Sequence, residues 1–583
     1  MFRNKRFVLL LFMVTIAVVS WWLDRYSLSL QLNSYIGSAG FFANSLPFVV
    51  FFLLLLALTN RAIFAGGFTL MMTAVIYLAN KEKLTLLEKP LSIQDTMFLK
   101  EIDWSVISLL GNYLDPRLLA LAVVPLIVLG VVFVNERPFF VIWPKLRSFI
   151  LLSSAVATYG MASGNQVFES IYDYQRLKLG WVDEESSLHA GLMSTLIYNG
   201  IKQKSSTDEP VDISAAERIF DKYPACSKKL PLPSADERPD IVVIQSESFF
   251  DPVVLSGVEA DANVLPNFRR AKSLGFGGEM LVPTFGGGTL RTEFEVLTGI
   301  PLFAYPRVQF PYTQVDMGSL HGMATELAGK GYETVAIHGN KGSFWNRKKT
   351  FEQAGFDSFL TMDDFPAEDG QEGWFASDNA MTTLMIERLS SSDQPKFIFA
   401  ISIEGHGPYG RSPVRDQSKW NTLAAPTGLS KAAAIEYKNY LYHINNADAE
   451  LGRILDFLKK RKRPYVLAFY GDHLPGFKYV YEETGFKNGM SAPQQQVPWL
   501  IVSNMAGPPE IHVPQSWVLG SNILRVAGYR GGRYFSLTRK IGKSLDTDER
   551  NSQDSLILDF MSVARLQLNG KLSGVVGDME MTK

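Results

Sequence analysis

A threonine that follows three consecutive glycines is the residue of this sequence best suited to covalent chemistry. Thr289 stands in PTFGGGTLRTEFEVLTGIPL, residues 283–302 of a 583-residue chain. Glycines let the backbone approach a ligand with no Cβ in the way, and the apolar residues Leu290, Phe294 and Leu297 then fall on one helical face. This places Thr289 at or beside a helix N-cap, where an anion is favoured, either a phosphate or an alkoxide of the threonine itself. A threonine in this position could also serve only as a cap.

Polar residues also stand where four apolar, strand-like runs end. Glu247 closes IVVIQSE, His338 comes at the end of ETVAIHG, His406 follows KFIFAISI, and Asp472 with His473 follow YVLAFYG. Ligands bind at the carboxyl ends of strands in parallel sheets, so we expect these side chains to share one edge. Each also has a structural alternative: a solvated acid, a pair of turn residues, or histidines satisfied inside the fold.

Together these residues offer a hard, oxygen-rich donor set with one nitrogen. Two carboxylates, one imidazole and a threonine oxygen suit Mn²⁺, Mg²⁺ or Zn²⁺, and they suit copper or iron–sulfur centres poorly. A divalent cation that contacts the threonine oxygen lowers the pKa of the hydroxyl and neutralises charge on a phosphorus centre under attack. We therefore expect Thr289 to act as a metal-activated nucleophile.

The segment HGNKGSFWNR, residues 338–347, adds a flat ring and a bidentate cation. Trp345 and Arg347 are of the kind that hold a small polar headgroup and its phosphate. The alternative is a loop aromatic beside a surface cation. We expect both residues to bind substrate next to His338.

Short apolar runs alternate with helical segments after about residue 236, which is typical of an α/β domain with a largely parallel central sheet. The expected strands are 241–247, 333–339, 396–403, 465–471 and 499–504, and the expected helices between them include 319–330, 379–390 and 431–460. Such a sheet would bring the polar strand ends together.

The first part of the chain has the composition of a membrane region. Apolar stretches cover 7–23, a segment ending in 47–58, 62–80, 118–135 and a segment beginning at Ser148, each near the roughly 20 residues that cross a bilayer. We predict five transmembrane helices. Lys and Arg collect at Arg3, Lys5, Arg6, Arg61, Arg137, Lys145 and Arg147, which predicts a cytoplasmic N-terminus. With five spans, the remainder lies outside the cytoplasm.

The predicted organisation therefore has three parts: a five-span transmembrane domain at 1–164, a helical connector at 165–235 and an extracytoplasmic catalytic domain at 236–583. The formal net charge of -1 gives no indication of a nucleic-acid partner. The single cysteine, Cys226, excludes an intrachain disulfide and Cys-x-x-Cys zinc or redox sites.

The motifs resemble those of a known family. IQSESF with Glu247, GGGTLRTEF with Thr289, HGNKGSFWNR, EGHGPY with His406, and YGDH with Asp472 and His473 are similar to the lipoteichoic acid synthase branch of the alkaline phosphatase and sulfatase superfamily. The layout of spans, connector and outer sulfatase-like domain also matches that family, so the resemblance covers nearly the whole chain.

The resemblance implies a phosphoglycerol transferase of the bacterial plasma membrane. Thr289 would be the nucleophile, and Glu247, Thr289, Asp472 and His473 would hold one metal, usually manganese. His338, Trp345, Arg347 and His406 would line the headgroup pocket, and His406 would also transfer a proton or bind phosphate. The donor would be phosphatidylglycerol in the membrane, and the acceptor a glycan or a glycerol phosphate chain.

Two segments, LRTE after Thr289 and SFFDP after Glu247, differ from the Gram-positive polymerising enzymes. This difference favours another acceptor, such as a periplasmic glucan or a surface polysaccharide. Two alternatives remain: a phosphoethanolamine transferase of the same superfamily, which would use phosphatidylethanolamine, and a non-catalytic protein that senses phospholipid headgroups. A sulfatase is disfavoured because Cys226 lies in PACSKK, outside the modifiable Cys/Ser-x-Pro-x-Arg setting that sulfatases need.

Overall fold

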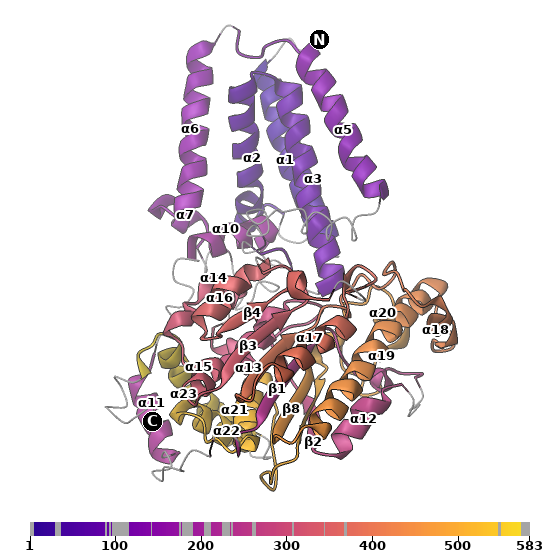
Figure 1. The fold of residues 1–583 in the computed structure, drawn as a ribbon. Helices are drawn as coiled ribbons and strands as arrows, with labels where there is room; N and C mark the ends of the chain where they lie inside the picture. The colour runs from indigo at the N-terminus through magenta and orange to yellow at the C-terminus, as the bar shows by residue number, and fades with distance from the viewer. Residues whose placement is uncertain are drawn as a thin grey trace. The chain divides into compact units, whose positions relative to one another are not determined.

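The computed structural model divides the chain into two compact units, Met1–Ser206 and Thr207–Lys583 (Figure 1). The structure describes residues 5–28, 36–87, 90–92, 95, 116–141, 143–173, 177, 190–202, 211–223, 234, 237–258, 264–305, 308–342, 344–366, 370–545 and 550–572. Cys226 and most of the segment from 88 to 115 lie outside these ranges.

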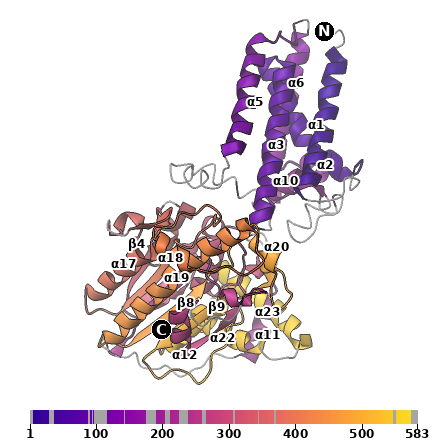
Figure 2. The same ribbon diagram turned by 90° about the vertical axis from the view of Figure 1, so that its right-hand side faces the viewer.

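The first unit is built from helices that run alongside one another (Figure 2). They are α1 (Lys5–Ser27), α2 (Ala39–Thr59), α3 (Ala62–Leu87), α5 (Pro116–Asn135), α6 (Pro144–Ser163), α7 (Gln166–Ile171) and α10 (Leu192–Lys202). Within the described ranges, three segments are long and apolar enough to cross a membrane: Phe7–Ser27, Ala39–Thr59 and Ala62–Leu84. The fourth and fifth predicted spans coincide with α5 and α6, and their crossing of the bilayer stays a prediction.

Specific caps join the helices of this unit. Ser38 caps α2, Asn60 ends it in the left-handed conformation, and the carboxylate of Glu136 accepts hydrogen bonds from the first N–H groups of α3. The N-terminus of α10 is capped by Asp24 and Asn44, whose side chains accept from the amides of Leu192 and Met193. Polar side chains therefore satisfy the end groups of these apolar helices, and the two that cap α10, Asp24 and Asn44, are buried.

The second unit contains a seven-stranded sheet in the order β2-β9-β8-β1-β7-β3-β4. The strands are β1 (Asp240–Ser246), β2 (Phe276–Met280), β3 (Glu333–His338), β4 (Ser358–Leu360), β7 (Lys396–Ile401), β8 (Tyr465–Gly471) and β9 (Val497–Ser503). β8, β1, β7, β3 and β4 pair in parallel, and β9 is antiparallel to both of its neighbours. The predicted mostly parallel sheet is confirmed.

Every residue of β1, β7 and β8 is buried, which explains why these strands are continuous apolar runs. In register, Val243 lies opposite Phe399 on one side and Ala468 on the other. Neighbouring residues of β8 show that helices cover both faces. The ring of Phe469 packs against Phe268 of α12 (Pro266–Ser273), whereas Tyr470 donates to Gln245, which in turn donates to the main chain of α13 (Thr289–Thr298).

Because successive strand residues face opposite sides, α12 and α13 lie on opposite faces of the sheet. α19 (Lys431–Lys460) packs against α12 and α17 (Asp378–Ser390), while α21 (Ser516–Val526) packs against α13 and α22 (Arg533–Leu545). The remaining helices of the unit are α11 (Ile213–Lys222), α14 (Pro311–Gln314), α15 (Met323–Ala328), α16 (Arg347–Gln353), α18 (Gln417–Thr422), α20 (Val480–Thr484) and α23 (Arg550–Leu568). The sheet is thus the middle layer of three.

All five predicted strands are present, and two predicted helices correspond to α17 and α19. The predicted helix at 319–330 is too long. The turn at Met317–Ser319 is separate, and α15 begins only after Gly322. The residues of the predicted connector are divided between the units: α7 and α10 belong to the first, and α11 packs against α23 in the second.

Candidate functional site

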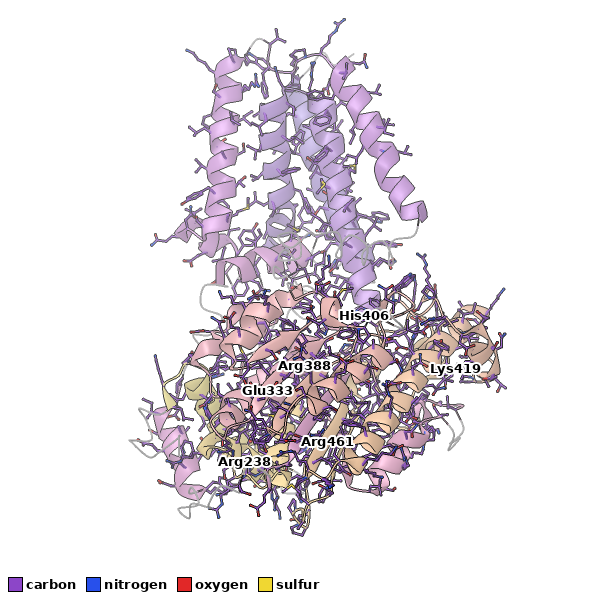
Figure 3. All side chains as sticks on the ribbon, viewed as in Figure 1. Arg238, Glu333, Arg388, His406, Lys419 and Arg461 are labelled. Atoms are coloured by element: carbon purple, nitrogen blue, oxygen red, sulfur yellow. The ribbon has the colours of Figure 1, made fainter. Side chains whose placement is uncertain are left out.

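Four adjacent parallel strands deliver the predicted site residues to one edge of the sheet. His338 is the last residue of β3, Glu247 follows β1, and Asp472 with His473 follow β8. His406 comes five residues after the end of β7. Figure 3 shows His406 at the end of the unit opposite to Arg238 and Arg461, of which Arg461 pairs with the first residue of β1. The structure therefore brings these strand ends together as expected.

Glu247, Asp472 and His473 form a buried cluster whose ligand atoms all lie within 4.8 Å of one another. Nε2 of His473 is 3.2 Å from Oδ2 of Asp472 and 3.6 Å from Oε1 of Glu247. Among the described residues, Oδ2 of Asp472 and Nε2 of His473 have no hydrogen-bond partner. Converging buried polar atoms without partners are what a cation site needs.

Main-chain groups fix the orientation of Asp472 and His473, and a serine hydroxyl fixes that of Glu247. Nδ1 of His473 lies 2.9 Å from the carbonyl oxygen of Leu474, so this nitrogen donates and Nε2 is left as the acceptor. The amides of Ser248 and His473 both donate to Oδ1 of Asp472, at 2.7 and 2.9 Å. Ser248 reaches this position with a φ of 55°, and its hydroxyl donates to Oε1 of Glu247.

Thr289 joins this cluster from the opposite direction. It is the first residue of α13, directly after the N-cap Gly288, and its hydroxyl donates to Oε2 of Glu247 at 3.3 Å. The three preceding glycines, Gly286 to Gly288, have φ values of 65°, 156° and 80°. A residue with a side chain would be strained in these backbone conformations. The side chain of Thr289 is half-buried, so its hydroxyl stays accessible to a substrate.

Burial raises the pKa of Glu247, and the neighbouring Asp472 carboxylate raises it further. Two acids held this close favour a shared cation, because a cation lets both ionise. Two carboxylates, one imidazole nitrogen and a hydroxyl fit Mn²⁺, Mg²⁺ or Zn²⁺. The geometry thus fits the predicted ligand set of Glu247, Thr289, Asp472 and His473, whose metal-binding role stays a prediction.

Two further histidines present a ring nitrogen at the same edge. Nδ1 of His338 lies 3.1 Å from the carbonyl of Ile401, and Nδ1 of His406 lies 2.8 Å from that of Gly407. Burial lowers the pKa of His338 well below its usual value, assisted by the charge of Arg347, and burial also lowers the pKa of His406. Both shifts favour the neutral ring, and because Nδ1 lies beside a carbonyl oxygen in each histidine, Nε2 can accept a hydrogen bond.

Arg347 is fixed by a buried ion pair. Its side chain is 1 % exposed and bonds to both carboxylate oxygens of Glu293, which also accepts from the hydroxyl of Tyr312. The ring of Trp345, at a φ of 59°, stacks on Phe310 with centroids 4.8 Å apart. A surface location for Arg347 is therefore wrong, and headgroup binding by Trp345 and Arg347 stays a prediction.

Glu293 is a site-supporting residue that the sequence analysis missed. It lies four residues after Thr289 in α13, and such a spacing places two residues on neighbouring positions of one helical face. That spacing was the signal available in the sequence. No sequence pattern indicated that Arg347, 54 residues away, would be the charge partner of Glu293.

Residues 239–529 match a protein-family model described as Sulfatase. The chain belongs to the alkaline phosphatase and sulfatase superfamily. The matched residues include β1, α13, β3, β7 and β8, and all the candidate site residues lie within the same range.

Two curated relatives are similar to this chain over part of its length. A Rhizobium meliloti protein provisionally named a cyclic beta-1,2-glucan modification protein is 31% identical over 409 residues, 68% of this chain and 62% of the relative. Lipoteichoic acid synthase 2 of Bacillus subtilis is 23% identical over 332 residues, 49% of each chain. The predicted resemblance to lipoteichoic acid synthases is confirmed, although the chain spans less than two thirds of either relative.

Two solved structures share the fold. A Streptococcus pyogenes phosphoglycerol transferase, GacH, in complex with sn-glycerol-1-phosphate aligns with a TM-score of 0.53 and 20% identity, over 63% of this chain and 95% of that one. The integral membrane phosphoethanolamine transferase EptA of Neisseria meningitidis aligns with a TM-score of 0.52 and 11% identity, over 88% and 95%. Both alignments show the shared fold, and the three apolar helices of the described ranges indicate a membrane protein.

Proposed function

We propose that this protein is a membrane-bound, metal-dependent transferase that moves phosphoglycerol from phosphatidylglycerol to a glycan or a glycerol phosphate acceptor. The observation that carries the proposal is the hydrogen bond of Thr289 to Glu247, beside two other buried metal-ligand side chains. Thr289 lies at the start of a helix, next to a cluster of two carboxylates and one imidazole that could hold a cation. A nucleophile in this position is suited to attack a phosphorus atom.

In the proposed reaction, the Thr289 oxygen forms a bond to the phosphorus atom while the bond from phosphorus to the diacylglycerol oxygen breaks. The proton of the threonine passes to that oxygen, which gives diacylglycerol and a phosphoglycerol–threonine intermediate. A divalent cation would be held by Glu247, Asp472, His473 and Thr289, and it would supply the Lewis acidity that lowers the pKa of the Thr289 hydroxyl. His406, held neutral by its surroundings, accepts the proton of the acceptor hydroxyl in the second step. His338 and Arg347 support the phosphate from the neighbouring strand and helix.

The comparisons support this donor and acceptor. The similar proteins include a lipoteichoic acid synthase, a phosphoglycerol transferase bound to sn-glycerol-1-phosphate, and a protein named for cyclic beta-1,2-glucan modification. The last of these has the highest identity of the three, so we favour a glucan or polysaccharide acceptor, in agreement with the departures at LRTE and SFFDP.

We further propose that the catalytic unit works outside the cytoplasm, at the outer surface of the plasma membrane. This proposal needs the five spans, the division into 1–164, 165–235 and 236–583, and the basic flanks described above. A lipid donor must be met at the membrane surface, and transmembrane helices keep the enzyme there.

A second candidate is phosphoethanolamine transfer from phosphatidylethanolamine. It is favoured by the alignment with EptA, which covers more of this chain than the alignment with GacH does. The two candidates share the threonine chemistry and differ in the headgroup alone.

The deciding experiment supplies the full-length protein, with Mn²⁺, with vesicles of either phosphatidylglycerol or phosphatidylethanolamine, each labelled in the headgroup. Peptide mass spectrometry should find phosphoglycerol on Thr289, with release of diacylglycerol, and the Thr289→Ala protein should show neither. An adduct from phosphatidylethanolamine alone would establish the second candidate. Headgroup binding without any adduct or diacylglycerol would indicate a sensor.

A further inference from the structure

A cavity of about 410 Å³ lies beside the hairpin formed by β5 (Gln371–Glu372) and β6 (Phe375–Ala376). Its lining includes Met362, Phe365, Gln371, Ala376 and Arg415. The volume is within the range of about 300–1,000 Å³ that small-molecule sites occupy. Neither the metal cluster nor Thr289 contributes to this cavity.

The walls of the cavity adjoin the segments that carry the two candidate histidines. The amide of Met362 donates to the carbonyl of Asn340, two residues after His338, at 3.3 Å. A Cβ built at Gly339 would lie 3.3 Å from that of Ala376. On the same hairpin, the ring of Phe375 packs against His406, with centroids 5.2 Å apart. The hairpin is therefore a wall shared by the cavity and the candidate active site.

The hairpin is held in place from both ends. The amide of Arg415 donates to Glu372 at 2.8 Å, and the amide of Ser377 donates to the carbonyl of Gly370 at 3.1 Å. This wall of the cavity is thus held in place, which lowers the entropy cost of binding against it.

A buried side-chain network supports the turn of the hairpin. A Cβ at Gly373, in that turn, would lie 3.6 Å from Cε1 of His443. His443 in turn lies between Ser412 and Glu404, at 3.1 and 3.2 Å. All three of these polar side chains are buried, so the network acts as a rigid base for the wall next to His406.

The lining combines apolar faces with planar polar groups. Phe365 and Met362 offer apolar surface, the Gln371 amide can donate and accept, and the Arg415 guanidinium donates only. A sugar ring needs this combination, because its faces carry C–H groups and its edge carries hydroxyls. A site for an anionic acceptor would be expected to contain several cationic side chains. Arg415 is the only charged residue among the described lining residues.

We propose that this cavity binds one sugar unit of a neutral glycan acceptor and presents its hydroxyl to the intermediate on Thr289. The inference rests on the proposed function and specifies its acceptor. The glycan oxygen forms a bond to phosphorus while the bond between phosphorus and Oγ1 of Thr289 breaks. The hydroxyl proton passes to Nε2 of His406 and then to the Thr289 oxygen, so both side chains return to their starting state.

The first test measures binding without the donor. Cyclic β-1,2-glucan is titrated into full-length Thr289→Ala protein, with and without the added pair Gln371→Ala and Arg415→Ala. The pair should weaken glucan binding about tenfold or more, as the loss of two hydrogen-bonding groups predicts. A matched control replaces Arg411 and Gln417, exposed residues outside the lining, by alanine. Affinities equal within about twofold for all these proteins would overturn the proposal.

The second test measures transfer in protein that keeps Thr289. With phosphatidylglycerol as donor, the ratio of glucan product to hydrolysed lipid should fall about tenfold in the Gln371→Ala, Arg415→Ala protein. This ratio corrects for any loss of folded enzyme. If sn-glycerol 1-phosphate, and not the glucan, lost transfer in this protein, the cavity would bind an anionic acceptor and the proposal would be wrong. An absent Thr289 adduct in the wild-type protein would instead refute the proposed function, and the binding test would still decide the cavity.

Discussion

The hydroxyl of Thr289 lies 3.3 Å from Oε2 of Glu247, so the first residue of α13 meets the acid that follows β1. The two residues come from opposite directions: the helix covers one face of the sheet, and the acid leaves the sheet at its carboxyl edge. A substrate phosphate bound there would face a helix N-terminus and a cation site together.

Glu247→Gln should lower the affinity for Mn²⁺ by about 100-fold or more, because loss of a direct ligand costs more than the 10–100-fold typical of a supporting group. The amide keeps the shape of the side chain and can still accept from Thr289, so the fold should be retained. Calorimetric titration of the full-length protein with Mn²⁺ measures the effect. Glu482→Gln, which changes an exposed acid of α20, is the control. Equal Mn²⁺ affinity in the two variants would mean that the ion binds elsewhere.

Gly288→Ala should slow the formation of the threonine adduct and destabilise the start of α13. Gly288 has a φ of 80°, and a Cβ there would lie 2.9 Å from Oγ1 of Thr284. The left-handed conformation alone costs an alanine about 1–2 kcal/mol, and relief of the contact moves the neighbouring Thr289. Single-turnover kinetics and the thermal midpoint should both change. Gly410→Ala is the matched control, because a Cβ there meets no atom within 4 Å.

Arg347→Ala should unfold the catalytic unit at a lower temperature as well as reduce turnover. The substitution leaves Glu293 buried without its cation, a change that typically costs about 3–5 kcal/mol. Replacing both partners, as Arg347→Met with Glu293→Gln, should recover much of the stability and none of the turnover. Recovery of stability and turnover together would show that Arg347 has only a structural role, and that the headgroup contact inferred from the sequence is wrong.

Sequence patterns predicted the parts of this fold whose residues carry local signals. β1, β7 and β8 are continuous apolar runs because both of their faces are buried, and the polar residues that follow them had to meet once the strands paired in parallel. The three glycines before Thr289 indicated a close backbone approach at a helix start, and the structure gives all three a positive φ.

Other features depend on partners far away in the sequence and could not be predicted locally. β2 reads FGGEM, with two glycines and no apolar run, and it is a strand because β9 pairs with it. Nothing in the sequence around Arg347 indicated that it would form a buried ion pair with Glu293. Each strand of the β5–β6 hairpin has only two residues, which is too short for an alternating pattern of apolar and polar residues to be recognised in the sequence.

Glu295 should make the stability of the catalytic unit depend on pH near neutrality. Glu295 belongs to α13, and its carboxyl group is buried. The carboxyl group accepts hydrogen bonds from the amide of Leu302 at 2.7 Å and from the hydroxyl of Ser516. Burial raises the pKa of Glu295 from 4.5 to about 7 in the folded protein. The folded state therefore keeps a proton that the unfolded state has lost, so this stabilisation is complete below pH 4.5 and is lost as the pH rises through 7.

Glu295→Gln should remove that dependence, because the amide cannot titrate and can still accept from Leu302. The shift of the Glu295 pKa corresponds to a difference on the order of 3 kcal/mol between acidic and alkaline conditions. Thermal midpoints of the full-length protein at pH 5, 6, 7 and 8 measure it, and the wild-type midpoint should fall more steeply with pH than that of the variant. Glu387→Gln, at an exposed acid of α17, should follow the wild-type curve. Parallel curves for wild type and Glu295→Gln would mean that Glu295 is ionised in the folded state, and that Ser516 and the amide of Leu302 stabilise its charge.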